Sequence, residues 1–179
     1  MAERLFFALW LPDSVAHHLN GRIAGLQQDS PSWLRWQPRS RWHITMCFLG
    51  DREEGERDRI ESVAAGAAAA ADAGEVRLAG SGRFGAVWWV GVQHSGWLDR
   101  VARGLNRTLV PHDQRRRFHG HVTIARARGR GVRPPGGAVL SDYEGPWWVP
   151  EEMVLVRSEL GPQPHYRTVA AWPLPAAGG

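Results

Sequence analysis

The sequence contains no lysine and only one cysteine, Cys47. A single cysteine cannot form a disulfide within the chain. Because residues 1–7 lack an export signal, a reducing cytoplasm is the expected compartment. Long hydrophobic runs are also missing, since no stretch approaches the roughly 18 apolar residues of a membrane-spanning helix. The 179 residues, 43% of them hydrophobic, fit one folded domain or two small lobes that share a core.

Because lysine is absent, all 22 basic residues are arginines. Seven of them lie in residues 115–133, here called the arginine segment, which contains no acidic residue. The rest of the chain has 15 arginines and 18 acidic residues, so the net charge of +4 comes from this segment. Such a concentration is typical of a polyanion-binding surface, although a solvated face would have the same composition.

Apolar periodicity predicts mixed strands and helices without regular alternation, which indicates an α+β fold. Strands are expected at residues 5–10, 42–49, 75–79, 86–92, 118–125, 147–149, 153–158 and 166–173. Helices are expected from residues 12–14 to about 28, at 60–73 and at 98–109, and loops at 31–38, 80–85 and 126–137. Residues 1–174 are interpreted as a single domain, and residues 175–179 as a frayed tail.

An internal repeat divides the chain into two related halves. Residues 43–46 read His-Ile-Thr-Met and residues 121–124 read His-Val-Thr-Ile, 78 residues further along. Strand side chains alternate between two faces, so His and Thr of each unit point the same way and their apolar neighbours point to the other side. Two such units facing one cleft would supply two imidazoles and two hydroxyls.

This set of groups suits phosphodiester chemistry. Imidazole titrates near pH 6.5, so one ring can act as a base and the other as an acid, while hydroxyls donate to phosphate oxygens. A lone strand histidine is more often structural, but two copies in equivalent strands favour function. A metal site is the less favoured interpretation, because zinc needs three or four ligands and only His119 could add a third to His43 and His121.

The residues around both motifs resemble the two-histidine phosphoesterase superfamily, and within it the RNA 2',3'-cyclic phosphodiesterases, also named 2'-5' RNA ligases. The resemblance covers nearly the whole chain and includes residues 4–9, 41–50, 82–84, 121–126, 155–158, Tyr166 and 172–174. It implies a bilobal α+β fold with pseudo-twofold symmetry, in which two antiparallel sheets flank a central cleft and the helices lie outside.

The resemblance also implies a mechanism. His43 would be the proton donor to the departing 3' oxygen, and His121 the proton acceptor that activates water. Thr45 and Thr123 would hold the phosphate and Arg126 would add charge. The implied substrate is RNA with a 2',3'-cyclic phosphate end, tRNA fragments being one candidate, and the product a 2'-phosphate. No metal or cofactor, no membrane and a monomeric state are expected, and the joining or cleavage of 2'-5' linkages is a further implied activity.

The sequence departs from the family pattern at Gly120, because a proline usually precedes the second histidine. Single-stranded bases stack on aromatic rings, so Trp36, Phe84 and Tyr166 are candidates for base stacking. Two alternatives stay open. The same site could act on a small cyclic nucleotide, or the cleft could belong to a noncatalytic RNA-binding module.

Overall fold

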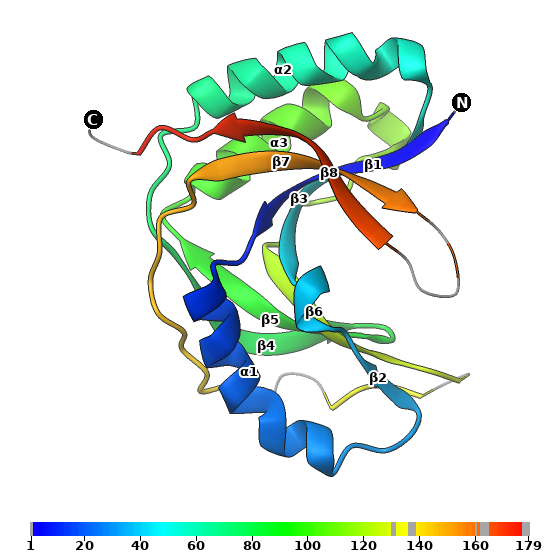
Figure 1. Cartoon of the computed structure of the whole chain (residues 1–179), viewed down its shortest axis with the longest axis vertical. Coiled ribbons are helices and arrows are strands. Elements are labelled where there is room, and N and C mark those ends of the chain that lie inside the picture. The colour runs from blue at the N-terminus through cyan, green and yellow to red at the C-terminus, as the bar shows by residue number, and fades with distance from the viewer. Residues whose placement is uncertain (1, 130–131, 136–138, 160, 162–164, 177–179) are drawn as a thin grey trace.

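The computed structural model describes residues 2–129, 132–135, 139–159, 161 and 165–176. These residues form two four-stranded antiparallel sheets and three α-helices, which confirms the expected α+β class (Figure 1). Within this part of the chain, no helix is both long enough and apolar enough to cross a membrane.

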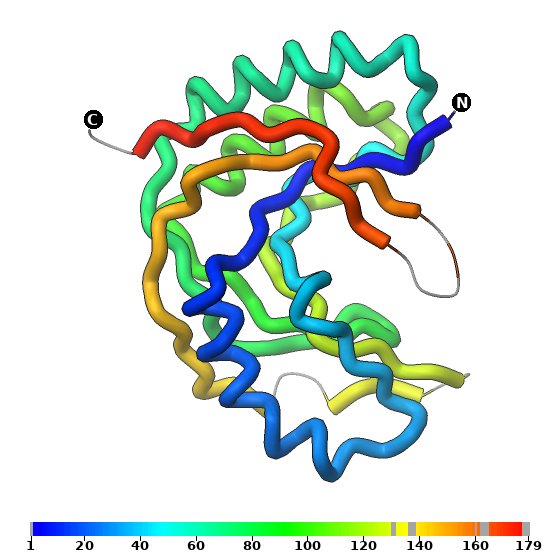
Figure 2. The backbone as a smooth tube through the Cα atoms, viewed as in Figure 1, coloured from blue at the N-terminus to red at the C-terminus, as the bar shows by residue number. Residues whose placement is uncertain are grey.

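The first sheet joins the two ends of the chain. Its strands are β1 (Glu3–Trp10), β3 (His43–Arg52), β7 (Glu152–Glu159) and β8 (His165–Pro173), in the order β3-β1-β7-β8 (Figure 2). Residues 5–9 of β1 are all buried, because this strand lies between β3 and β7 and is covered on both faces. The continuous apolar run in the sequence therefore marks a central strand.

The second sheet contains β2 (Leu34–Trp36), β4 (Val76–Phe84), β5 (Val87–His94) and β6 (His121–Ala127), in the order β2-β6-β5-β4. Three details differ from the expectation. β2 lies inside the expected loop at 31–38, because it pairs with the distant β6. β4 continues through the expected glycine-rich turn to Phe84, since Ser81 to Phe84 pair with β5, and the chain turns at Gly85. β6 begins at His121 rather than at residue 118.

The expected strand at residues 147–149 is also wrong. Trp148 makes only an isolated bridge to Val76, within a segment that runs alongside β4. In the expected loop at 126–137, β6 extends through Ala127, and residues 130, 131, 136 and 137 lie outside the described residues. In the expected frayed tail, the carbonyl of Pro175 accepts a hydrogen bond from the Ala73 amide, and residues 177–179 lie outside the described residues.

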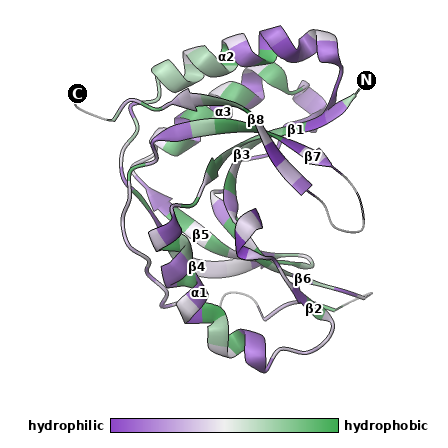
Figure 3. Cartoon of the chain, in the orientation of Figure 1, coloured by the Kyte–Doolittle hydropathy of each residue, from purple (hydrophilic) through white to green (hydrophobic). Residues whose placement is uncertain are grey.

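The helices are α1 (Asp13–Gln28), α2 (Arg57–Ala69) and α3 (Trp97–Leu109). α1 and α3 bury the apolar positions that their sequence periodicity predicts, and α2 buries Ile60, Ala64 and Ala68. In Figure 3, α2 is hydrophilic over its first turns and hydrophobic over its alanine-rich second half. α2 ends four residues before the expected position 73, because Asp72 has a positive φ and Ala73 forms a bridge with Ala176.

The helices lie on the outer sides of the sheets. α2 and α3 pack together over the first sheet, with α3 against β3 and α2 against β8 (Figure 1). α1 follows β1 but lies beside the second sheet, where Arg22 forms an ion pair with Asp142 (2.9 Å) in the segment next to β4. This arrangement leaves the facing surfaces of the two sheets free to form a site.

Candidate active site

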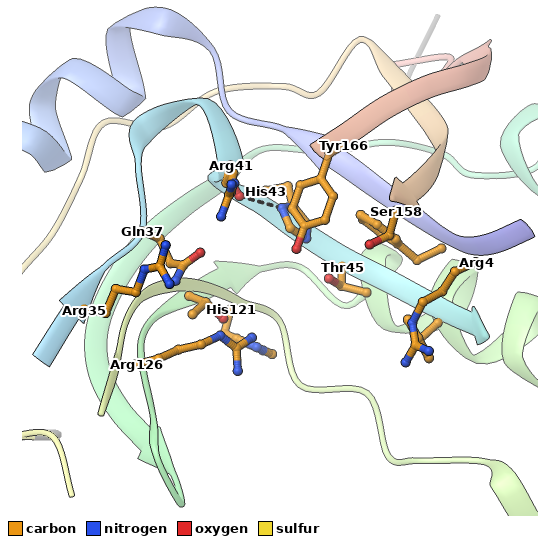
Figure 4. A pocket seen from close by; sticks show the side chains of 13 residues that line it. Arg4, Arg35, Gln37, Arg41, His43, Thr45, His121, Arg126, Ser158 and Tyr166 are labelled. Carbon is orange, nitrogen blue, oxygen red and sulfur yellow. Dashed lines mark hydrogen bonds between the residues drawn. The ribbon is translucent and has the colours of Figure 1, made fainter. Parts of the chain in front are cut away.

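A cleft of about 440 Å³ lies between the two sheets, where β3 of one approaches β6 of the other (Figure 4). Its lining consists of Arg4, Phe6, Arg35, Gln37, Arg41, His43, Thr45, Phe48, His121, Thr123, Arg126, Ser158 and Tyr166. Both His-x-Thr units therefore meet in one cavity. The apolar residues that follow the two histidines, Ile44 and Val122, are fully buried on the opposite face of each strand, as the alternation of strand side chains requires.

The two motif strands share an irregularity that strict alternation does not reveal. A β-bulge in β3 leaves Met46 without a paired residue on β1. A second bulge, in β6, leaves Ile124 without a paired residue on β5. Each bulge shifts the following residues by one position. Phe48 and Arg126, each five residues after its motif histidine, consequently reach the cleft, and the two strands have the same burial pattern over those six residues.

Both imidazoles are oriented in the same way. Nδ1 of His43 lies 2.7 Å from the carbonyl oxygen of Arg41, and Nδ1 of His121 lies 2.7 Å from the carbonyl oxygen of His119. A carbonyl can only accept a hydrogen bond, so each Nδ1 carries a hydrogen and each Nε2 is left for chemistry. In both units the acceptor is the residue two positions earlier, which is a second sign of the internal repeat.

Gly120, the departure from the family pattern, is held by backbone contacts. Its carbonyl accepts a hydrogen bond from the Val92 amide (3.1 Å), which continues the pairing of β5 with the chain before His121. A Cβ atom at this position would lie 3.2 Å from the Cβ of Val92. The glycine therefore allows β5 to approach closely beside His121.

Aromatic rings surround His43. The rings of Phe6, Trp10 and Tyr166 lie 5.0, 5.6 and 5.3 Å from the imidazole, centroid to centroid. Burial lowers the pKa of His43 to about 4 against the raising effect of the Arg41 carbonyl, and the charges of His121 and Arg126 lower it further. Both imidazoles line the same cleft, so a positive charge on one disfavours a positive charge on the other.

The pKa of His121 is also lowered. Burial is the main cause, followed by the opposing hydrogen bond to the His119 carbonyl and by the charges of His119 and Arg126. Both imidazoles are consequently neutral near pH 7 in the unliganded protein. A neutral imidazole with Nδ1–H bonded to a carbonyl has a free electron pair on Nε2, which is the form that a general base needs.

Four arginines and no acidic residue line the described cleft. Arg35, Arg41 and Arg126 have no ion-pair or hydrogen-bond partner for their side chains among the described residues. Arg4 lies 3.8 Å from Asp51 and stacks over the Phe48 ring. A cavity with unpaired guanidinium groups attracts anions and suits the bidentate binding of phosphate.

Most of this charge does not come from the arginine segment. Among the residues of that segment that the structure describes, Arg126 alone lines the cleft. Arg115 instead donates to the carbonyls of Val110 and Arg107 at the end of α3, and Arg130 lies outside the described residues. Sequence reasoning missed Arg35 and Arg41 as site residues, because β2 and the turn before β3 come to the cleft only through long-range pairing.

The three candidate stacking residues lie in different places. Tyr166 lines the cleft and meets His43 edge to face. Phe84 is 45% exposed and touches His121, but it lies on a neighbouring groove. Trp36 is not brought to the cleft, because its Nε1 donates to Ser30 Oγ (3.0 Å) and its ring packs on Trp88. Ser158, on β7 beside Tyr166, also lines the cleft.

Comparison with known proteins gives consistent matches over most of the chain. The model of the 2'-5' RNA ligase superfamily matches residues 11–161. The RNA 2',3'-cyclic phosphodiesterase of Thermus thermophilus is 30% identical over 182 residues, which cover 93% of this chain and 87% of that protein. The protein of the same name from Geobacillus stearothermophilus is also 30% identical over 172 residues, and the chain spans 54% of its length.

A solved structure has the same fold as this chain. The crystal structure of TT0787 from Thermus thermophilus superimposes with a TM-score of 0.77 and 27% sequence identity, covering 97% of this chain and 98% of that one. The bilobal arrangement of two antiparallel sheets is therefore shared with a solved structure over nearly its full length.

Proposed function

Because the chain belongs to the 2'-5' RNA ligase superfamily, we propose that it opens 2',3'-cyclic phosphodiester ends of RNA to 2'-phosphomonoesters. The observation that carries the proposal is the meeting of both His-x-Thr units in one cleft, where Arg35, Arg41 and Arg126 have no side-chain partner among the described residues. Relatives that carry the name RNA 2',3'-cyclic phosphodiesterase support the same reaction.

In the proposed reaction, all the catalytic groups are side chains of this protein. Nε2 of His121 takes a proton from water as the water oxygen attacks phosphorus. The bond between phosphorus and O3' breaks, and Nε2–H of His43 donates a proton to O3'. The hydroxyls of Thr45 and Thr123 donate to the non-bridging oxygens, and Arg126 stabilises the charge that develops there. The phosphate stays on O2'.

His43 has to be protonated for this role, yet its pKa is about 4 in the unliganded protein. Bound substrate places a phosphate anion in the cleft, and a nearby negative charge favours the protonated imidazole. Substrate binding therefore promotes protonation of His43. No metal is required by the proposal, and among the described residues no cluster of three or more His, Cys, Asp or Glu side chains could hold one.

This proposal predicts an acidic pH optimum for the free enzyme. The active form has His43 protonated and His121 neutral, so kcat/KM is highest between their two pKa values, both of which lie below 6.5. Above that optimum, kcat/KM is expected to fall about tenfold per pH unit. The optimum of kcat is expected at higher pH, because the bound phosphate raises the imidazole pKa values. A kcat/KM that rises between pH 6.5 and 8 would contradict the protonation scheme.

The arginines favour an RNA chain over a small cyclic nucleotide. Arg41 lies beside His43, on the leaving-group side, and Arg35 pairs in register with Arg126 through β2 and β6. Both guanidinium groups line the cleft without a partner among the described residues, and in the proposed complex they bind the phosphate that precedes the terminal nucleotide.

Neutralising these two arginines tests the substrate class. The Arg35→Gln, Arg41→Gln double variant is expected to lose about tenfold in kcat/KM for a cyclic-phosphate-ended oligoribonucleotide, because charge-assisted phosphate contacts are lost. The loss for a 2',3'-cyclic mononucleotide should be smaller. Arg100→Gln, on the exposed face of α3, is the matched control. Equal losses on both substrates would favour the small-nucleotide alternative.

The direct test of the function is turnover with EDTA present. A labelled oligoribonucleotide with a 2',3'-cyclic end is incubated with the protein, and its end group is followed. We expect conversion of the cyclic end to a phosphomonoester. Salt-sensitive binding without conversion would instead indicate the noncatalytic RNA-binding module.

A further inference from the structure

A small apolar cluster lies on the cleft-facing side of the first sheet, apart from the main core of the protein. Its four buried members come from β1 and β7 and are Phe6, Ala8, Val154 and Val156. The residues that alternate with them along both strands belong to the main core, so the two sets point to opposite faces of the sheet. Phe6 lines the cleft, which therefore has an apolar floor that phosphate binding does not explain.

Trp10 and Tyr166 pack on this floor, and both side chains are partly buried. The indole is fixed by a hydrogen bond, because Trp10 Nε1 donates to Thr168 Oγ1 at 3.1 Å. This bond ties the last residue of β1 to β8, which lies two strands away in the sheet. The Tyr166 ring meets Phe6 edge to face, with 5.3 Å between the ring centroids. Contacts within the first sheet therefore hold both rings in place.

The cluster and its two covering rings surround His43. The strand register pairs Trp10 directly with His43, and the Phe6 ring lies close to the imidazole. The planes of the Trp10 and Tyr166 rings make angles of 73° and 88° with the imidazole plane. Since Nδ1 is bonded to the carbonyl oxygen of Arg41, the imidazole is held at its ring and at one nitrogen. Its Nε2 is left to reach a bound phosphodiester.

The surroundings of His121 are more open. Its ring neighbours are Phe84, Trp89 and His119, and the side chains of Phe84 and His119 are exposed. The internal repeat thus gives each imidazole aromatic neighbours, but in one half of the molecule they are buried and in the other they face solvent. A base that activates water needs access to water, whereas an acid that protonates a leaving oxygen does not. The asymmetry matches the two roles.

We propose that Trp10 and Tyr166 are positioning residues for the general acid, which fix the plane of the His43 ring and keep water away from it. The inference rests on the proposed function, because it takes His43 as the proton donor. A protonated imidazole that water does not stabilise gives its proton more readily to O3'. Trp10 lies outside the described lining of the cleft, so it acts on the reaction through His43 and not through contact with the substrate.

The titratable and charged groups that face the general acid come from three elements. His121 and Arg126 lie on β6, Arg41 precedes β3, and the phenol of Tyr166 lies on β8, while no acidic residue lines the described cleft. Replacing Trp10 leaves all these groups in place and changes only the burial of the imidazole. Because burial lowers the pKa of this imidazole, opening its aromatic surroundings raises that pKa.

The test combines an NMR titration of the histidine Cε1–H signals of the free protein with kinetics on a cyclic-phosphate-ended oligoribonucleotide. In Trp10→Leu, the pKa of His43 is expected to rise by about one pH unit. At the pH optimum of each protein, kcat should fall about tenfold and KM should stay within about twofold, because a misplaced acid affects the reaction step and not binding. Thr168→Val removes the hydrogen-bond acceptor of the indole with little change of shape, and both effects should be smaller and in the same direction.

Further variants separate positioning from a general effect of losing an aromatic ring. Tyr166→Phe keeps the ring and should leave the pKa of His43 unchanged, whereas Tyr166→Leu should raise it. Trp147→Leu is the matched control for Trp10→Leu, because Trp147 is exposed, stacks on Arg77 and lies outside the described lining of the cleft. This control should change neither the titration nor kcat.

The His121 signal in the same spectrum reports on the fold. Unfolding moves both signals to the position of a free histidine, whereas loss of positioning moves mainly that of His43, and Thr168→Val decides if Trp10→Leu fails to fold. An unchanged pKa of His43 in the folded variants, or a raised pKa with unchanged kcat, would overturn the inference alone. Absence of turnover by the wild-type protein would overturn the proposed function and the role of His43 as acid, whatever the titration shows.

Discussion

Replacing His43 or His121 by alanine is expected to lower kcat for opening of an RNA 2',3'-cyclic phosphate by about 10²–10⁴-fold, the range that a general acid or base contributes. Each imidazole is fixed by a carbonyl at Nδ1 and has only Nε2 free toward the cleft. The two rings act in one step, so the double variant should be little worse than the more damaging single variant. Single-turnover rates at saturating enzyme measure this loss directly.

His17→Ala is the matched control for the histidine variants. His17 is exposed on α1 and does not line the cleft, so its replacement should leave the rate unchanged. Substrate binding should survive in all the variants, because the arginines stay in place. Full activity in the His43→Ala, His121→Ala double variant would contradict the acid–base mechanism.

Arg126→Gln is expected to have the second-largest effect, a loss of about 100-fold in kcat/KM. Removing one preorganised donor to a developing oxyanion costs about 10²–10³-fold in other enzymes, and the amide of glutamine keeps one neutral donor at this position. The bulge at Ile124 directs Arg126 into the cleft, whereas Arg128 does not line it.

Arg128→Gln is therefore the control for Arg126→Gln, because it removes the same charge two residues further along the chain. Its effect should be within about threefold and should disappear at higher salt, as expected for an exposed charge. Equal losses in the two variants would show that Arg126 acts through the general field of the protein and makes no specific contact with the phosphate. The kinetics of both variants are compared at two salt concentrations.

The repeat in the sequence was sufficient to predict the motif strands. The alternation of His and Thr with apolar residues requires one buried and one open face, and β3 and β6 have that pattern. The helix at α3 was equally visible, because its buried residues recur at helical spacing. These features depend on local patterns that the sequence displays directly.

Other features depend on contacts between distant residues. β2 is only three residues long and exists because it pairs with β6, so its sequence looks like a loop. Gly82 of β4 looks like a turn residue, but a Cβ atom there would lie 2.3 Å from the Trp89 ring, so the glycine makes room for this side chain. The arginine segment predicts a polyanion-binding surface, whereas Arg4, Arg35 and Arg41 of the cleft come from other parts of the chain.

The most direct test of the central claim is the identity of the phosphomonoester that the wild-type protein forms from a cyclic-phosphate-ended oligoribonucleotide in the presence of EDTA. Phosphorus NMR of the isolated product distinguishes a 2'-phosphate from a 3'-phosphate. An acid that protonates O3' and a base that activates water predict the 2'-phosphate alone, formed at the same rate with and without the chelator. A 3'-phosphate, or loss of turnover on chelation by a protein that stays folded, would contradict the account.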